Sequence, residues 1–241
     1  MQQFFTSILF CLQNARYLFI LFLPAITLDF AQLYILTNFI ISSIDEGMLK
    51  SSMLEVLNTI PQAVNQIGLF SNLFFVILTG SLSVAFCSIA RGELKTPHQA
   101  LYRGASKFIS LFGAWLTLYL LCMSSLLILS ILGFLGIIIW GFVLLYAMAR
   151  FGMMPSFIML KKANAIEALK LSYQATQDHA GKLFLLTTVF FLIYIVLTSI
   201  FFVIFGPNTL FIILTVFVKY LTLAPLFYVF FSLYEFKYIN I

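Results

Sequence analysis

Two charged side chains lie within long apolar stretches of this sequence, where charges are rare. Asp29 is found in LFLPAITLDFAQLY and Lys219 in ILTVFVKYLTLAPLF. In a segment that crosses a membrane, an ionised side chain at mid-depth costs about 2.5 to 3.5 kcal/mol, so it is expected to face the protein interior and find a partner. Asp29 and Lys219 are therefore predicted to pair, either as a structural contact between two helices or as a functional polar site.

Each of these charges has a proline about a turn and a half away, on the same side of the membrane. Pro24 precedes Asp29, and Pro225 follows Lys219. Proline removes a backbone hydrogen bond and frees the carbonyl four residues before it. Both helices are thus predicted to be broken or loosened at matched depth, which would form a polar pocket around the charges. Transporters place substrates and coupling ions at broken helices of this kind.

Other residues with catalytic or metal-binding chemistry are few in this sequence. His98 and His179 lie near predicted helix ends, and no carboxylates are spaced around them to form a metal or acid–base site. The cysteines, Cys11, Cys87 and Cys122, are widely separated, which fits neither a disulfide framework nor a metal-binding spacing. Phosphate-binding glycine motifs are also missing. We therefore expect no catalytic residue, no metal site and no cofactor, and a protein that is not an enzyme.

The elements that carry these residues follow from the composition. Hydrophobic residues make up 63% of the 241 residues and charged residues only 9%, which is incompatible with the surface of a soluble domain. A span needs roughly 20 apolar residues, so about six spans use most of the chain. The sequence predicts an all-α polytopic membrane helix bundle, a single integral membrane domain over 1–241. The predicted spans lie near 17–40, 67–90, 108–128, 133–154, 183–205 and 209–233.

Two further segments have the pattern of amphipathic interfacial helices. Residues 1–14 have an apolar face and a polar face at helical spacing. The apolar face is formed by Phe4, Phe5, Ile8, Leu9 and Leu12, and the polar residues predicted to lie opposite are Gln2, Gln3, Ser7 and Gln13. Residues 43–61 begin with a capping-box pattern and end at Pro61, which predicts an amphipathic helix on the extracytoplasmic side. It would lie on the membrane surface or dock a partner.

The distribution of basic residues predicts the orientation. Of the thirteen Lys and Arg residues, all except Lys50 and Lys219 fall on one side of the predicted spans. Basic loops stay in the cytoplasm, so both termini of this multi-pass protein are predicted to be cytoplasmic. This face suits the phospholipid bilayer and its anionic lipids, and not a nucleic acid. The predicted inner-leaflet basic surface comprises Arg91, Lys95, Arg103, Lys107, Lys161, Lys162, Lys170 and Lys182.

Two similar phrases, TPHQAL at 96–101 and NAIEAL at 164–169, occur in the predicted cytoplasmic loops. Thr96 and Asn164 are residues that cap helix N-termini, and Gln99 and Glu167 follow three places later as in a capping box. Each loop is therefore predicted to contain a short helix. The segments 67–128 and 133–205 then have the same order of span, loop helix and span, which suggests a hairpin repeat.

The second of these segments has Pro155 at the end of a span, then a short basic connector, and then the phrase formed by Ala168, Leu169 and Ser172. In these features it resembles the YciC-like family of uncharacterised bacterial inner-membrane proteins. TGSLSVAFCSIARGELKTPHQAL is similar to the family's second span and the loop after it. The family is related in pattern to the membrane domain beside some glycerophosphodiester phosphodiesterases. The resemblance implies a location in the bacterial inner membrane and a role in envelope maintenance or lipid homeostasis.

Two functions of different classes remain open from the sequence. In the first, the protein is non-enzymatic and acts in envelope or lipid homeostasis by binding lipid, a membrane protein partner or a second copy of itself. In the second, it is a small transporter or lipid translocator that uses a mid-membrane polar site at Asp29 and Lys219. A closed, dry ion pair would favour the first function, and an open groove around the charges would favour the second.

Overall fold

The described part of the chain is built from helices, because its long apolar sequences satisfy their backbone groups internally only in that form. The computed structural model describes residues 2–45, 62–93 and 96–238, and no strand occurs among them. The helices are α1 (Gln2–Gln13), α2 (Ala15–Asp45), α4 (Gln62–Ala90), α5 (Pro97–Ser106), α6 (Phe108–Leu129), η2 (Ser130–Leu132), α7 (Phe134–Phe151), α8 (Met154–Leu160), α9 (Ala165–Ala175), η3 (Gln177–His179), α10 (Ala180–Phe205) and α11 (Thr209–Tyr238).

Six of these helical segments are long and apolar enough to cross a membrane, which confirms the predicted all-α polytopic bundle. They are Ala15–Ile41, Gln62–Ala90, Phe108–Leu132, Phe134–Leu160, Gln177–Phe205 and Thr209–Tyr238. The predicted fourth span, 133–154, corresponds to α7, and the apolar segment continues beyond it after a break, because α7 ends at Phe151 and α8 begins at Met154. Pro155 causes this break, since a proline is tolerated in the first turn of a helix and not in its interior.

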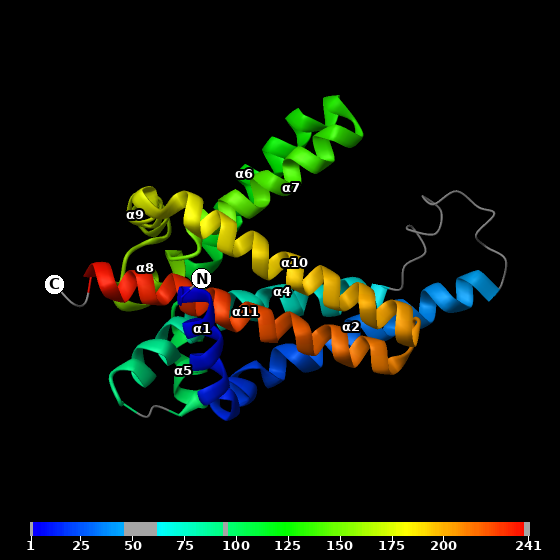
Figure 1. Ribbon diagram of the computed structural model, residues 1–241, viewed down its shortest axis with the longest axis horizontal. Coiled ribbons are helices and arrows are strands. Elements are labelled where there is room, and N and C mark those ends of the chain that lie inside the picture. Colours follow the sequence, from blue (N-terminus) through cyan, green and yellow to red (C-terminus); the bar gives the residue numbers. More distant parts are fainter. Residues whose placement is uncertain (1, 46–61, 94–95, 239–241) are drawn as a thin grey trace.

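Helix α4 is the centre of the packing (Figure 1). Buried residues make up 67% of its apolar stretch and 56% of that of α11, against 6% for α10. Hydroxyl groups along α4 bind its neighbours: Trp115 of α6 donates to Thr79 at 3.2 Å, and Ser156 of α8 donates to Ser83 at 3.2 Å. Within a membrane, small polar residues of this kind allow helices to approach closely and to hydrogen-bond across the contact. We call α2, α4, α10 and α11 the body.

The hairpin formed by α6, η2 and α7 diverges from the body toward the end that lies opposite the termini (Figure 1). Only 11% and 17% of its two apolar stretches are buried. Leu127, Ile131 and Phe134 near its tip are 74%, 85% and 76% exposed. Trp140 of α7 donates to the carbonyl of Cys122 at 2.8 Å and joins the two arms. We call this segment the lateral hairpin, and its apolar surface is suited to contact with lipid.

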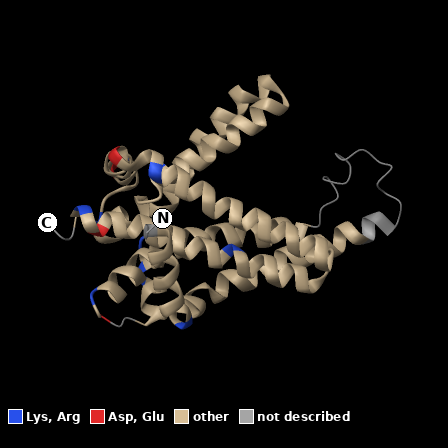
Figure 2. Ribbon diagram, viewed as in Figure 1, with Lys and Arg blue, Asp and Glu red and all other residues tan. Residues whose placement is uncertain are grey.

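Both described chain ends, the short helices α5, α8 and α9, and most Lys and Arg residues lie at one end of the molecule (Figures 1 and 2). We call it the basic end. The ammonium group of Lys237, near the end of α11, donates to the Asp178 carboxylate at 3.1 Å and to the Ala175 carbonyl at 2.8 Å. These contacts connect α11 to the end of α9. They fix the last turns of the final span against the second capped helix.

The capping pattern in the two similar phrases is observed in the structure. Thr96 accepts from the Gln99 amide, and the Gln99 side chain accepts from the Thr96 amide, so α5 begins with a complete capping box. Asn164 accepts from the Glu167 amide at 2.9 Å and starts α9. The second copy differs because α8 lies between α7 and α9. The hairpin repeat itself stays a prediction.

Helix α1 packs against α11 and α2, and its buried face differs from the predicted one. Ser7 and Cys11 are buried, whereas Phe5, Leu9 and Leu12 are more than half exposed. The assignment of Ser7 to the solvated side is therefore wrong. Its hydroxyl donates to the carbonyl of Phe4 at 2.7 Å, which satisfies the group without water and makes its burial tolerable. Burial also raises the pKa of the Cys11 thiol to about 12, because the thiolate is poorly solvated there.

The predicted amphipathic helix over 43–61 falls mainly on residues 46–61, which lie outside the described residues. Residues 43–45 form the end of α2 instead of the start of a separate helix.

Candidate functional site

The carboxylate of Asp29 is the centre of a polar cluster that joins three helices of the body. Asp29 lies in α2 and is 5% exposed. Lys219 and Tyr220 of α11 donate to it at 2.5 and 2.6 Å, and Ser71 of α4 donates to its other oxygen. The predicted partners Asp29 and Lys219 are thus in contact, and two further donors complete the site.

Three donors make this cluster a closed arrangement for the carboxylate. A buried charge is tolerated only when its charge and its lone pairs are both matched, and here one cation and two hydroxyl groups do so. The cation is less enclosed than the anion, since the side chain of Lys219 is 37% exposed and that of Asp29 is 6% exposed. The geometry is that of a clamp between α2, α4 and α11, with the ammonium group at its edge.

Sequence reasoning missed Ser71 and Tyr220. Tyr220 follows Lys219 directly, and neighbours in a helix point about 100° apart, so a shared partner is not evident from spacing. Ser71 is one of several hydroxyl residues in α4, and nothing along the chain distinguishes it from the others. The one available indication was that Ser71 has an uncharged polar group within a predicted span, and such a group needs a hydrogen-bond partner in the membrane.

The two prolines do not break their helices, which corrects the predicted helix breaks. α2 runs continuously through Pro24 and α11 through Pro225. A membrane helix tolerates an internal proline when its surroundings accommodate the carbonyl that the proline leaves without a partner. The predicted polar pocket is also wrong, because the cavity beside these helices is apolar and is lined by neither Asp29 nor Lys219.

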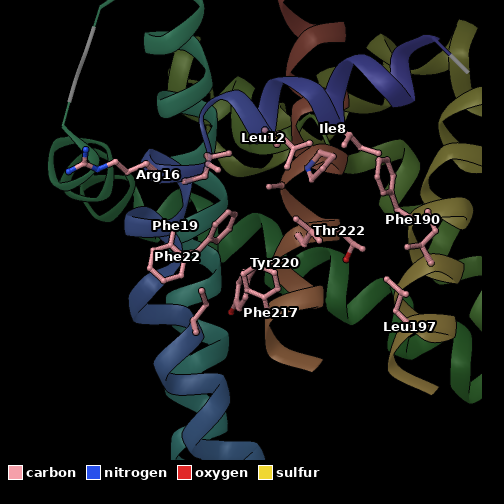
Figure 3. Close-up of a pocket in the computed structure, with 18 residues that line it drawn as sticks. Ile8, Leu12, Arg16, Phe19, Phe22, Phe190, Leu197, Phe217, Tyr220 and Thr222 are labelled. Atoms are coloured by element: carbon pink, nitrogen blue, oxygen red, sulfur yellow. The ribbon is translucent and has the colours of Figure 1, made fainter. Parts of the chain in front are cut away.

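That cavity, which we call the apolar groove, has a volume of about 620 Å³ and lies between α1, α2, α10 and α11. Figure 3 shows α1 crossing one end of it, with Phe22 of α2, Tyr220 of α11 and Phe190 of α10 on its walls. The stem of Arg16 lies at the margin, and its guanidinium group points away from the groove (Figure 3). The groove therefore offers an apolar interior with a cation just outside it.

Tyr220 belongs to both the groove and the polar cluster. Its ring lines the groove and packs at 5.0 Å from the Phe22 ring, while its hydroxyl donates to Asp29. The carboxylate is consequently separated from the groove by the wall that Tyr220 forms. Pro225 and Ala224, on the same helix, leave this part of the wall shallow because their side chains are small.

The residues of the predicted basic surface have different surroundings in the structure. Lys161 stacks on the Tyr238 ring, 3.9 Å from its centre, while Lys170 and Lys182 are exposed on α9 and α10. Lys95 lies outside the described residues. The remaining four line a second cavity of about 210 Å³ at the basic end: Arg91, Arg103, Lys107 and Lys162.

Arg150 is a buried charge that the sequence analysis did not single out from the other basic residues on its side of the spans. It lies in the last turn of α7 and is 3% exposed, with its guanidinium carbon 3.8 Å from the centre of the Tyr173 ring. Its carbonyl accepts from Ser172 at 2.9 Å and from Thr176 at 3.2 Å. Arg150 thus connects the end of α7 to α9 through its backbone carbonyl. The main contact of its charge is the cation–π contact between the guanidinium group and the Tyr173 ring.

The two histidines lie on different elements and do not form a common site. His98 lies in the first turn of α5 beside a shallow hollow, and His179 precedes α10. Within the described ranges, no three His, Cys, Asp or Glu side chains are grouped closely enough to hold a metal ion.

These observations define the class: an α-helical, multi-pass membrane protein with an internal polar clamp, a lateral apolar groove and a basic end. Comparison of the chain with family models, with curated proteins and with solved structures found no match. The assignment of a function therefore depends on the geometry of the sites.

Proposed function

We propose that this protein is a non-enzymatic lipid-binding protein of the bacterial inner membrane that acts in envelope or lipid homeostasis. The observation that carries the proposal is the apolar groove, which would take an acyl chain between α2, α10 and α11. The head group of the same lipid would lie at the basic end, near the exposed guanidinium of Arg16. The resemblance to YciC-like proteins agrees with this role.

Shape and head-group charge must supply the selectivity of such binding. Lipid tails are as apolar as the groove, so the hydrophobic effect alone does not retain one lipid against the surrounding bilayer. A groove roofed by α1 restricts the chain on several sides, and each well-placed basic residue adds about 1 kcal/mol toward an anionic head group. The concentration of basic residues also supports a cytoplasmic location for this end, and hence for both termini.

The transporter alternative has less support in the geometry. A substrate or ion site needs unsatisfied polar groups that face a cavity, as broken membrane helices supply. The Asp29 carboxylate already accepts from Lys219, Tyr220 and Ser71, and the two proline-containing helices are continuous. The closed pair therefore favours lipid binding over transport through this centre.

Filling the groove tests the proposal. Leu197 lines the groove from α10, and Ile200, less than one turn further along, does not line it and is 45% exposed. Leu197→Trp should block the groove, whereas Ile200→Trp adds the same bulk on the lipid-facing surface. Each variant would be purified in a mild detergent, and native mass spectrometry would count the retained phospholipids.

We expect Leu197→Trp to lose a phospholipid that both the wild type and Ile200→Trp retain. Equal retention by all three proteins would exclude the groove as a lipid site, provided that circular dichroism shows the same helix content in each.

A further inference from the structure

The cavity at the basic end brings together cations that are distant in the sequence. Arg91 follows the end of α4, Arg103 belongs to α5, Lys107 lies between α5 and α6, and Lys162 follows α8. The volume is about 210 Å³, which is the scale of a small polar group and not of an acyl chain. One carboxylate, that of Glu93, also lies on the wall, so the cations outnumber it.

The lining of this cavity has a net positive charge, with four cations and one carboxylate. Like charges that converge on one small volume repel each other, and a bound anion would remove that repulsion. Arginine and lysine together present many N–H donors, which is the arrangement that proteins use for phosphate oxygens.

The backbone at Lys162 supports a specific role for its side chain. Among the residues that the structure describes, Lys162 is the one non-glycine residue with a positive φ, at 59°. Glycine adopts this left-handed conformation at lower energy, so a turn needed only for chain reversal would favour glycine there. The two adjacent lysines have different surroundings. Lys161 stacks on the Tyr238 ring, whereas Lys162 lines the cavity.

The start of α6 lies beside the same cavity. Lys107 is the N-cap residue of α6 and makes no side-chain cap, and Lys107 and Ser106 both line the cavity wall. Lys107 is also the C-cap residue of α5, so the ends of two helices meet at this wall and the side-chain cations supply its positive charge.

From these observations we infer that the basic cavity is a binding site for a phosphate group. The group would be carried either by an anionic lipid or by free phosphate. The site uses α4, α5 and the segments before α6 and after α8, whereas the apolar groove uses α1, α2, α10 and α11. The inference therefore goes beyond the groove and does not depend on it.

The test uses the full chain in an uncharged detergent at constant ionic strength, with binding measured by isothermal titration calorimetry. The probes are dioctanoyl phosphatidic acid, dioctanoylglycerol, which is the same lipid without phosphate, and inorganic phosphate. The cavity variants are Arg103→Gln and Lys162→Gly. Lys170→Gln is the matched control, because Lys170 is exposed on α9 outside the cavity.

Phosphatidic acid should bind, and each cavity variant should weaken it roughly tenfold, the usual effect of removing one charged hydrogen-bond donor. Lys170→Gln and the groove variant Leu197→Trp should change the affinity less than about twofold. Comparable binding of inorganic phosphate assigns the site to free phosphate, and binding of the phospholipid alone assigns it to the head group. Lys162→Gly also replaces a lysine whose backbone is in the left-handed conformation, which glycine adopts at lower energy. The variant should therefore be at least as stable as the wild type.

Three results would overturn the inference: equal affinity for dioctanoylglycerol, equal weakening by Lys170→Gln and the cavity variants, or no binding of either phosphate-bearing probe. Failure of the lipid-retention experiment on Leu197→Trp would leave this result unaffected, so the two proposals can fail separately.

Discussion

The polar clamp predicts a specific pattern of stability changes around Asp29. Replacing it by asparagine in Asp29→Asn keeps the shape of the side chain and its acceptor oxygen, but removes the negative charge. Lys219 would then be an ammonium group in the membrane without a counter-ion, since Ser71 and Tyr220 carry no charge. The perturbation therefore isolates the charge from the packing.

The structure gives the size of the effect. Breaking a buried ion pair by removing one partner costs about 3 to 5 kcal/mol, and the exposed edge of Lys219, 37% of its side chain, reduces this toward the lower limit. We expect Asp29→Asn to lower the free energy of unfolding by about 3 kcal/mol. Lys219→Met should also be costly, because it leaves the more buried charge, that of Asp29, with two hydroxyl donors but without a cation. In the double variant no charge is left unpaired, so its cost should be below the sum by about 2 kcal/mol or more.

Unfolding would be followed in detergent micelles by titration with sodium dodecyl sulfate. The two tryptophans are suitable reporters because each donates a hydrogen bond to another residue, Trp115 to Thr79 and Trp140 to the Cys122 carbonyl. Lys182→Met is the matched control, since Lys182 is exposed at the start of α10. The reasoning would be refuted if the losses of unfolding free energy for Asp29→Asn and Lys219→Met added up in the double variant. It would also be refuted if Lys182→Met lost as much unfolding free energy as Lys219→Met.

Three further predictions concern other contacts. Tyr173→Ala uncovers the buried arginine of α7 and should cost about 2 kcal/mol in the same assay, whereas Tyr102→Ala, at a 71% exposed tyrosine, should cost little. Gly152→Ala places a Cβ against a phenylalanine ring of α11 and should destabilise, while Gly141→Ala meets open space and should be neutral or stabilising by up to about 1 kcal/mol. With the other two cysteines replaced by alanine, Cys11 should react with a small alkylating reagent about tenfold faster per pH unit from pH 7 to 10, because its pKa is raised to about 12; a plateau near pH 9 would contradict this.

The spans and the ion pair were predictable from the sequence because both follow from the cost of polar groups in a membrane. Apolar length alone located the six spans, and the charges of Asp29 and Lys219 required an interior partner. The cap at Thr96 was predictable for a similar reason, since a capping box is formed by residues that are close in the chain. These features depend on local composition or on a single strong penalty.

The remaining features depend on which helix faces lie together, and no pattern in one chain determines that. Ser71 and Tyr220 complete the clamp because α4 and α11 present those faces to α2. Arg150 is buried because α9 folds over the end of α7 and places Tyr173 on it. The prolines were misjudged because an internal proline does not by itself end a membrane helix, and the apolar lining of the neighbouring groove depends on which helix faces meet there.

The lateral hairpin has a consequence for the bilayer around the protein. It leaves the body near the basic end and diverges from it toward the other end (Figure 1). In a bilayer, lipid would fill the angle between the hairpin and α10. The outer half of the hairpin is therefore held by contacts between its own two arms, and not by the body.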